Sequence, residues 1–287
     1  MKAKLLLSVL LLGFVRRGAG GAGGGHGSQG AGTSTPNSIV ISPDPAAVTL
    51  EATQVFTAVV YDSNNNVLNV TPSWEVTGGI GTITNAGLFT ATAEGTGIVR
   101  AVYGGLSDEA AVTVKGNFFP HEIGYSWTYS KSGTDETTVI TVTGTSTSII
   151  TGETITIFSN TRKNPSGSII ESQEAYYKVI DSAVYYYGYT YGATTAIYLP
   201  PMTALSFPLS IGKTWTYSNS AATYTFTVMA FEDVITPAGT FKCYKIETSL
   251  ALYYGTFTWH MWYGNNAGFV KSLDPYGGAE ILESKNF

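Results

Sequence analysis

The side chains that could support catalysis or bind a metal are few and scattered. The single cysteine, Cys243, excludes an intramolecular disulfide and any metal site built from several cysteines. His121 falls in an expected loop and His260 in an expected strand, and the sequence has no Gly-x-Ser-x-Gly nucleophile elbow. Cys243 alternates with Phe241 in an expected strand, which is typical of a buried thiol. We therefore expect no catalytic residue, no metal site and no cofactor.

Two groups of acidic and amide side chains need separate consideration. Glu232 and Asp233 are a pair of carboxylates, but adjacent strand residues face opposite ways and so cannot flank one glycosidic bond. Asp62, Asn64 and Asn66 offer oxygen atoms, yet calcium takes six or more oxygen ligands, usually including a bidentate glutamate. We interpret the first pair as a structural acidic turn and the second group as a plain turn.

Aromatic density is the feature that most suggests binding. The chain is 13% aromatic with 19 tyrosines, and strand alternation would place Tyr185, Tyr187, Tyr189 and Tyr191 on one face. In 257–263 the same alternation separates Trp259 from Trp262. Such rings could stack on sugars, or line a curved sheet that holds a lipid chain. The alternative is that tyrosine simply suits a half-exposed pleated surface. We take these six aromatic residues as the candidate ligand-binding set.

Charge restricts the possible partners. Only 12% of the residues are charged and the net charge is −5, with the four basic residues before position 36 lacking acidic neighbours. Binding to nucleic acid requires lysine and arginine to neutralise phosphate, and anionic membranes select the same residues. The composition therefore argues against both partners, and it leaves carbohydrate or another envelope component as the expected partner.

The first 36 residues resemble an export signal followed by a linker. Lys2 and Lys4 precede the apolar run 5–15, which is too short for a helix that crosses a membrane. Residues 11–13 resemble the start of a bacterial lipoprotein cleavage box, but Phe14 stands where the lipidated cysteine belongs, so a lipid anchor is not supported. Residues 18–32 hold nine glycines, the composition of a flexible tether. We expect an extracytoplasmic protein with no membrane span in its mature part.

Residues 37–115 alternate in short runs separated by turns, the pattern of a small β-sandwich. They resemble the group 2 bacterial Ig-like domain through Ser73-Trp74, 81–91, the glycines at 94–97 and the closing 111–114. The resemblance implies a surface or secreted protein in which this module is a spacer or an adhesive unit. It carries no catalytic residues. We expect Trp74 in the core, a positive-φ Gly87 and a tight hairpin at 95–97.

Residues 117–287 contain one sequence twice. The stretches 119–130 and 207–218 match at eight of twelve positions, and both begin with Phe-Pro and end with Trp-Thr-Tyr-Ser. Similar hairpin patterns follow each copy, so two similar units are expected at about 117–205 and 206–287. The complete prediction is an all-β chain, in which an Ig-like sandwich precedes a larger antiparallel domain folded as a curled sheet or half-barrel.

The last 85 or so residues also resemble a family of bacterial envelope proteins without an assigned activity. The resemblance rests on the acidic hairpin and Pro-Ala-Gly turn within 231–242 and on the Gly-x-Val-Lys at 268–271. It implies an open half-barrel sheet and gives no substrate.

Three functions remain open from the sequence. The first is a non-enzymatic binding or adhesion protein of the bacterial surface or envelope. The second is an envelope carrier or chaperone that holds an apolar ligand in a curved sheet. A polysaccharide-active enzyme is the third, and the sequence shows no catalytic pair for it. A concave apolar pocket would favour the carrier, and a flat aromatic row would favour carbohydrate adhesion.

Overall fold

The computed structural model describes residues 35–148, 151–220 and 222–287, and residues 36–287 form one compact unit. Every regular element in these residues is a β-strand, so the all-β prediction is confirmed. Within this described part, nothing helical is long and apolar enough to cross a lipid bilayer. The predictions for the signal-like segment, for Phe14 and for the glycine-rich linker lie outside the described residues.

Residues 36–115 form three small sheets. Their orders are β1-β4-β5, β2-β10-β9-β6 and β3-β8-β7. The strands are β1 (Pro36–Ser42), β2 (Ala46–Thr49), β3 (Thr53–Val55), β4 (Thr57–Asp62), β5 (Val67–Leu68), β6 (Ser73–Thr77), β7 (Gly81–Ile83), β8 (Leu88–Ala91), β9 (Gly95–Tyr103) and β10 (Leu106–Lys115). Most pairs are antiparallel, and β10 pairs with β2 in parallel.

Turn chemistry in this region follows the sequence in part. Gly87 has φ of +78°, and a Cβ there would meet the Phe56 carbonyl oxygen at 2.2 Å, so only glycine fits this turn. The Asp62 carboxylate accepts hydrogen bonds from the backbone nitrogens of Asn64 and Asn66, the arrangement expected of a turn. The expected hairpin at 95–97 is wrong, because Gly95 opens the nine-residue strand β9.

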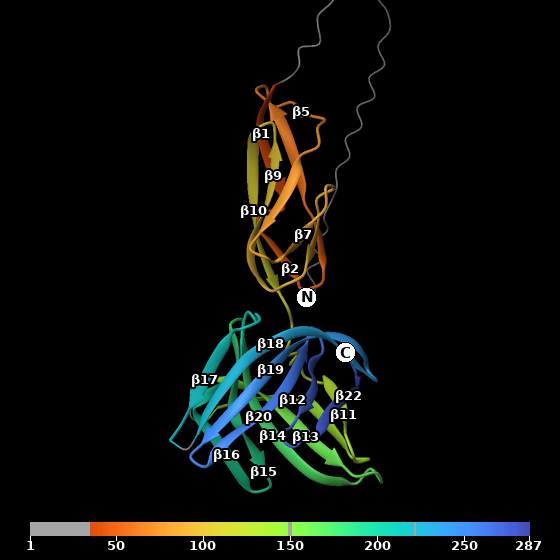
Figure 1. The fold of residues 1–287 in the computed structure, drawn as a ribbon, viewed down its shortest axis with the longest axis vertical. Coiled ribbons are helices and arrows are strands. Elements are labelled where there is room, and N and C mark those ends of the chain that lie inside the picture. Colours follow the sequence, from red (N-terminus) through yellow and green to blue (C-terminus); the bar gives the residue numbers. More distant parts are fainter. Residues whose placement is uncertain (1–34, 149–150, 221) are drawn as a thin grey trace, which may run out of the picture. The chain divides into compact units, whose positions relative to one another are not determined.

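Residues 126–285 form one antiparallel sheet of twelve strands, in the order β16-β15-β14-β13-β12-β11-β22-β21-β20-β19-β18-β17 (Figure 1). The strands of the first half are β11 (Ser126–Lys131), β12 (Thr137–Thr147), β13 (Thr154–Lys163), β14 (Ile169–Ile180), β15 (Ala183–Tyr191) and β16 (Thr194–Ser206). Those of the second half are β17 (Thr214–Ser218), β18 (Thr223–Thr236), β19 (Gly239–Leu252), β20 (Gly255–Gly264), β21 (Gly268–Leu273) and β22 (Ala279–Lys285).

The sheet consists of two six-stranded units, as the sequence repeat predicts. Gly124 and Gly212 occupy equivalent turns with φ of +94° and +86°. The Gly124 nitrogen donates to the Val142 carbonyl at 2.8 Å, and the Gly212 nitrogen donates to the Val228 carbonyl at the same distance. The turn before the repeated Trp-Thr-Tyr therefore has the same hydrogen bond in both copies. Each copy of the motif begins a unit, and the first strands of the two units, β11 and β17, are equivalent.

The sheet curls until its outermost strands approach each other (Figure 1). β16 and β17 exchange no ladder hydrogen bonds, but side chains join them. The Trp215 indole nitrogen donates to the Thr203 carbonyl at 2.9 Å, and the rings of Tyr198 and Tyr217 lie 5.8 Å apart. The curled-sheet prediction is thus confirmed, and the curvature gives the sheet an inner and an outer face.

Candidate functional site

The four predicted tyrosines of β15 do not share one face. In the ladder between β14 and β15, Tyr176 is opposite Gly188 while Tyr177 is opposite Tyr186, so Tyr187 is an extra residue in a β-bulge. A second break between Tyr186 and Gly188 appears in the ladder with β16. A bulge reverses which side chains point inward along the rest of the strand. The predicted alternation from residue 185 to residue 191 is therefore wrong.

Tyr185 and Tyr187 belong to the outer face. The Tyr187 hydroxyl and the Lys178 ammonium both donate to the Glu153 carboxylate. Hydrogen bonding from Lys178, and then from Tyr187, holds the pKa of Glu153 below its usual value. Tyr187 is only 5% exposed, so most of its ring packs into the structure and it offers a ligand little surface.

Tyr186 and Tyr189 lie on the inner face. Burial first, and then the nearby phenols of Tyr177, Tyr198 and Tyr189, raise the pKa of Tyr186 well above its usual range. Tyr191 ends the strand and is half exposed. The Tyr186 phenol consequently stays neutral at physiological pH and presents an uncharged surface on the inner face.

Aromatic rings form a belt around the inner face. Neighbouring rings in this belt have centroids 5.0–6.4 Å apart, within the range of favourable aromatic pairs. In order, the belt consists of Phe158, Tyr177, Tyr186, Tyr198, Tyr217, Tyr224 and Trp259. It crosses the junction between β16 and β17, so the belt itself helps to keep the sheet curled.

The two candidate tryptophans of β20 are on opposite faces. Trp259 joins the inner belt through Tyr224. Trp262 is on the outer face, where its indole nitrogen donates to Glu232 at 2.7 Å and the ammonium groups of Lys245 and Lys271 lie 5.1 Å and 5.0 Å from its ring. This separation agrees with the alternation predicted for 257–263. The structure thus divides the six candidate aromatics between two faces and does not bring them together as one site.

A recess opens on the inner face beside the belt. It has an inner hollow of about 250 Å³ and an outer hollow of about 510 Å³, and Met261, Phe269 and Glu280 line both. The inner hollow is also lined by Phe119, Pro120, Trp127, Tyr129, Ile140, Phe158, Asn160, Ala175, Tyr177, Tyr263 and Gly268. The outer one adds Phe257, Trp259, Ser272, Leu273, Asp274 and Pro275. We call these two hollows together the recess.

Three of the aromatic side chains that line the recess have hydrogen-bond partners for their polar atoms. The Trp127 indole nitrogen donates to the Ala267 carbonyl at 2.6 Å, and the Tyr129 hydroxyl donates to the Phe269 carbonyl at 2.9 Å. The Tyr263 hydroxyl lies 3.6 Å from the Met261 sulfur. Because these groups already have partners, the side chains offer mainly apolar surface to the recess.

One carboxylate faces both hollows. Glu280 accepts a hydrogen bond from the Thr138 hydroxyl at 3.1 Å. With Asn160 it supplies hydrogen-bonding capacity within an otherwise aromatic and aliphatic wall. A site of this composition can take an apolar chain and orient a polar group at its end.

The residues considered for catalysis stay separate. His121 is in a loop, with its Nδ1 3.0 Å from the Phe119 carbonyl oxygen, whereas His260 pairs with Glu247 at 3.2 Å in the outer face. Cys243 is fully buried, and burial followed by the charge of Glu232 raises the pKa of its thiol to about 12. Among residues 35–148, 151–220 and 222–287, no three histidine, cysteine or carboxylate side chains gather in a possible metal site.

Sequence reasoning missed most of the recess. Strand alternation in 257–263 puts Met261 and Tyr263 on the face of Trp259, but no local pattern connects Phe158, Tyr177 and Glu280 with them. Phe158 and Glu280 are 122 residues apart in the sequence, and the pairing of β11 with β22 brings their two halves of the sheet together. The repeat was the available signal, because it indicates that Trp127 and Trp215 open equivalent units whose inner faces could meet.

Comparison with known proteins gives a partial family match. Residues 212–285 match a family model described as DUF3108-like, which is less than half of the chain. No curated protein matches the sequence.

Several solved structures are similar. A Bacteroides fragilis protein described as exported and as having a YmcC-like fold is 18% identical, with a TM-score of 0.39 over 60% of this chain and 100% of its own. A Parabacteroides distasonis protein described as a lipoprotein is 16% identical, with a TM-score of 0.39 over 59% and 98%. Domains 5–6 of the S-layer protein SbsC are 10% identical, with a TM-score of 0.27 over 86% and 97%.

Proposed function

We propose that this chain is an exported binding protein of the bacterial envelope, which holds an apolar ligand inside its curled sheet. The observation that carries the proposal is the recess, whose two hollows share Met261 and Phe269 and whose walls consist mainly of aromatic and aliphatic side chains. Concave, mainly apolar sites with a few polar groups are the usual form of small-molecule sites. The ligand class that fits is a chain-like apolar molecule with a polar end near Glu280.

The role is binding and not catalysis. Of the carboxylates that face the recess, Glu280 receives a hydrogen bond from Thr138 and Asp274 receives backbone hydrogen bonds from Tyr276 and Gly278. No histidine is among the described residues that line the two hollows, so neither carboxylate has one as a partner there. A neutral aromatic wall favours retention of a ligand by its apolar surface.

The experiment is a titration of residues 36–287 with N-phenyl-1-naphthylamine, a dye that fluoresces in apolar surroundings. Met261→Trp adds bulk at a residue that lines both hollows, and it should weaken dye binding at least tenfold. Met229→Trp adds the same bulk at a position that is 46% exposed on β18, and it serves as the matched control. The proposal fails if the wild-type protein does not bind the dye, or if Met261→Trp binds it as tightly as the control does.

The remaining parts of the chain suit export. We infer that residues 1–36 act as a signal and linker, and that 37–115 form an Ig-like spacer that precedes the binding sheet. Fusion of residues 1–36 to alkaline phosphatase, which becomes active only outside the cytoplasm, tests the export signal. An inactive fusion would contradict the extracytoplasmic location.

Adhesion to carbohydrate is the second candidate, and a groove on the outer face favours it. The groove has a volume of about 280 Å³, and side chains with hydroxyl groups line it together with Ile155, Ile157 and Ile197. Tyr176 contacts Glu174 at 3.1 Å and Thr190 at 2.7 Å, and Thr190 contacts Thr195 at 2.9 Å. Calorimetric titration with oligosaccharides should detect heat that Tyr176→Phe reduces. An equal heat for this variant and the wild type would exclude the groove.

A further inference from the structure

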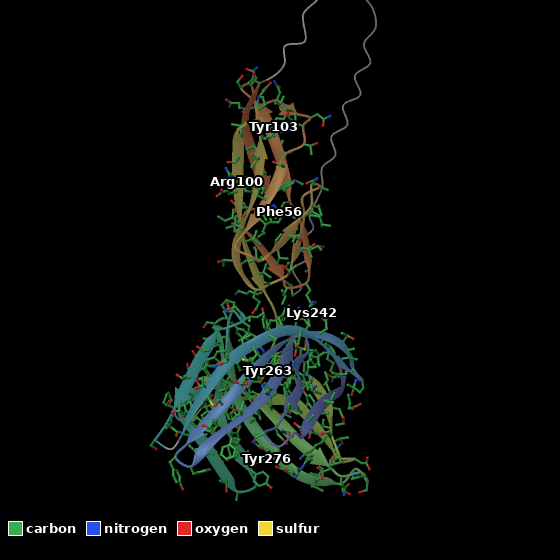
Figure 2. All side chains as sticks on the ribbon, viewed as in Figure 1. Phe56, Arg100, Tyr103, Lys242, Tyr263 and Tyr276 are labelled. Carbon is green, nitrogen blue, oxygen red and sulfur yellow. The ribbon has the colours of Figure 1, made fainter. Side chains whose placement is uncertain are left out.

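The topology of the curled sheet places its connections alternately at two opposite ends. Each of the strands β11 to β22 is antiparallel to its neighbours, including β11 to β22 across the centre. The odd-numbered strands therefore all run in one direction, and every turn from an odd- to an even-numbered strand lies at the same end of the sheet. We call this the turn end; Tyr276 lies there in Figure 2, and Lys242 near the start of β19 lies at the other end.

Three turns at the turn end share the dipeptide Tyr-Gly. They are Tyr191-Gly192 after β15, Tyr254-Gly255 after β19 and Tyr276-Gly277 between β21 and β22. Their tyrosines are 49%, 64% and 85% exposed, and Tyr253 beside the second turn is 97% exposed. Exposed aromatic rings gathered at one end of a sheet mark an interaction surface. We call these four tyrosines the rim.

The rim carries almost no charge. Residues 191–194 and 252–256 contain no ionisable acid or base except the tyrosines. The third turn has Asp274, whose carboxylate oxygen accepts hydrogen bonds from the backbone nitrogens of Tyr276 and Gly278, both at 2.8 Å. That carboxylate holds the turn in shape and leaves the Tyr276 ring projecting from it.

The rim is continuous with the recess. The outer hollow is lined by Phe257, Leu273 and Pro275, which all lie within three residues of a rim tyrosine. The rings of Phe257 and Tyr254 are 6.2 Å apart, and those of Tyr254 and Tyr253 are 4.8 Å apart. A path of aromatic contacts therefore runs from the wall of the recess to the most exposed tyrosine in the sheet.

We propose that the rim docks on the surface of a zwitterionic lipid bilayer, so that the recess opens towards the lipid chains. Tyrosine is enriched where membranes meet water, because its ring suits the acyl boundary and its hydroxyl suits the headgroups. None of the three rim turns contains lysine or arginine, and the net charge is −5; both features disfavour anionic headgroups, which select those residues. The docking proposal deepens the proposed function and rests on it, because the bilayer would be the source or the destination of the apolar ligand.

The test is co-sedimentation of residues 36–287 with phosphatidylcholine vesicles. We use this compact unit because the apolar run 5–15 could bind vesicles by itself. A variant with Tyr191, Tyr253, Tyr254 and Tyr276 all changed to serine should lose at least tenfold in partitioning. The matched control is Ile235→Ser, which removes a side chain that is 82% exposed next to the turn between β18 and β19, at the opposite end of the sheet. It should bind vesicles as the wild type does.

The outcomes separate docking from ligand binding. The docking proposal is overturned if the fourfold serine variant binds vesicles like the wild type. It is also overturned if the wild-type protein does not bind the vesicles. If light scattering then shows dimers that the fourfold variant does not form, the rim is an interface between copies of the chain. Dye binding in lipid-free solution reports on the recess alone. If the protein binds vesicles but not the dye, ligand binding in the recess is refuted and docking by the rim is supported.

Discussion

Replacement of Gly188 by alanine tests whether the bulge in β15 shapes the inner face of the sheet. Gly188 has φ of +138°, and a Cβ built on it would lie 2.0 Å from the Ala196 carbonyl oxygen of the neighbouring strand. Gly192 in the same hairpin also has positive φ, +58°, but nothing lies within 4 Å of its Cβ position. The two glycines thus share backbone strain on substitution, and only Gly188 adds a clash with backbone.

The expected magnitudes follow from this difference. Gly192→Ala should cost about 1 kcal/mol, the strain of an L-residue in the left-handed region. Gly188→Ala carries similar strain, and the neighbouring strand must also move, which adds roughly 1–3 kcal/mol as in overpacked cores. We therefore expect a loss of about 2–4 kcal/mol. At roughly 2–4 °C per kcal/mol for a domain of this size, Gly188→Ala should melt several degrees below Gly192→Ala.

Thermal unfolding followed by tryptophan fluorescence measures the difference, and dye titration at a temperature where both variants are folded adds a functional reading. The bulge places Tyr186 on the inner face, where its ring lies 5.0 Å from that of Tyr177 in the wall of the recess. Distortion of the bulge should therefore also weaken dye binding in Gly188→Ala and not in Gly192→Ala. Equal melting temperatures for the two variants would refute the argument, because the close approach to Ala196 would then have no energetic weight.

Two further predictions concern titration and thiol reactivity. The pKa of Glu153 is lowered by hydrogen bonds from Lys178 and then Tyr187, so its stabilising contribution is complete above the unfolded-state pKa of about 4.3 and is lost as the pH falls through the lower folded-state value. Glu153→Gln should therefore flatten the dependence of the melting temperature on pH at the acidic end, and a dependence identical to that of the wild type would contradict this role. Cys243 is buried with a thiol pKa raised to about 12 by burial and then by Glu232, so Ellman's reagent at pH 8 should react with it only after unfolding in urea. Rapid reaction of the folded protein would show that β19 opens.

Parts of this structure follow from local residue patterns. Period-2 alternation in 257–263 correctly places Trp259 and Trp262 on opposite faces, because successive strand residues always diverge in a regular ladder. The repeated Ile-Gly before Trp-Thr-Tyr identifies Gly124 and Gly212 as equivalent turns, since the same local sequence forms the same backbone twice. Turn chemistry also predicts the positive φ of Gly87.

The alternation rule fails wherever strand register is set from outside the strand. The residues of β15 do not indicate that Tyr187 is the extra residue of a bulge. A bulge depends on how two neighbouring strands match in length and twist. The sequence therefore predicts tyrosines on one face, whereas the ladders with β14 and β16 divide them between two.

The sequence by itself determined that the chain is built from strands, that its larger sheet is made of two similar units, and that turns lie at Gly87, Gly124 and Gly212. These properties depend on contacts between residues close in the chain. The recess and the rim were decided only by tertiary structure. They require β11 to pair with β22 and the sheet to curl until Tyr198 meets Tyr217, and the twist and register that bring such distant residues together are not encoded in any one segment.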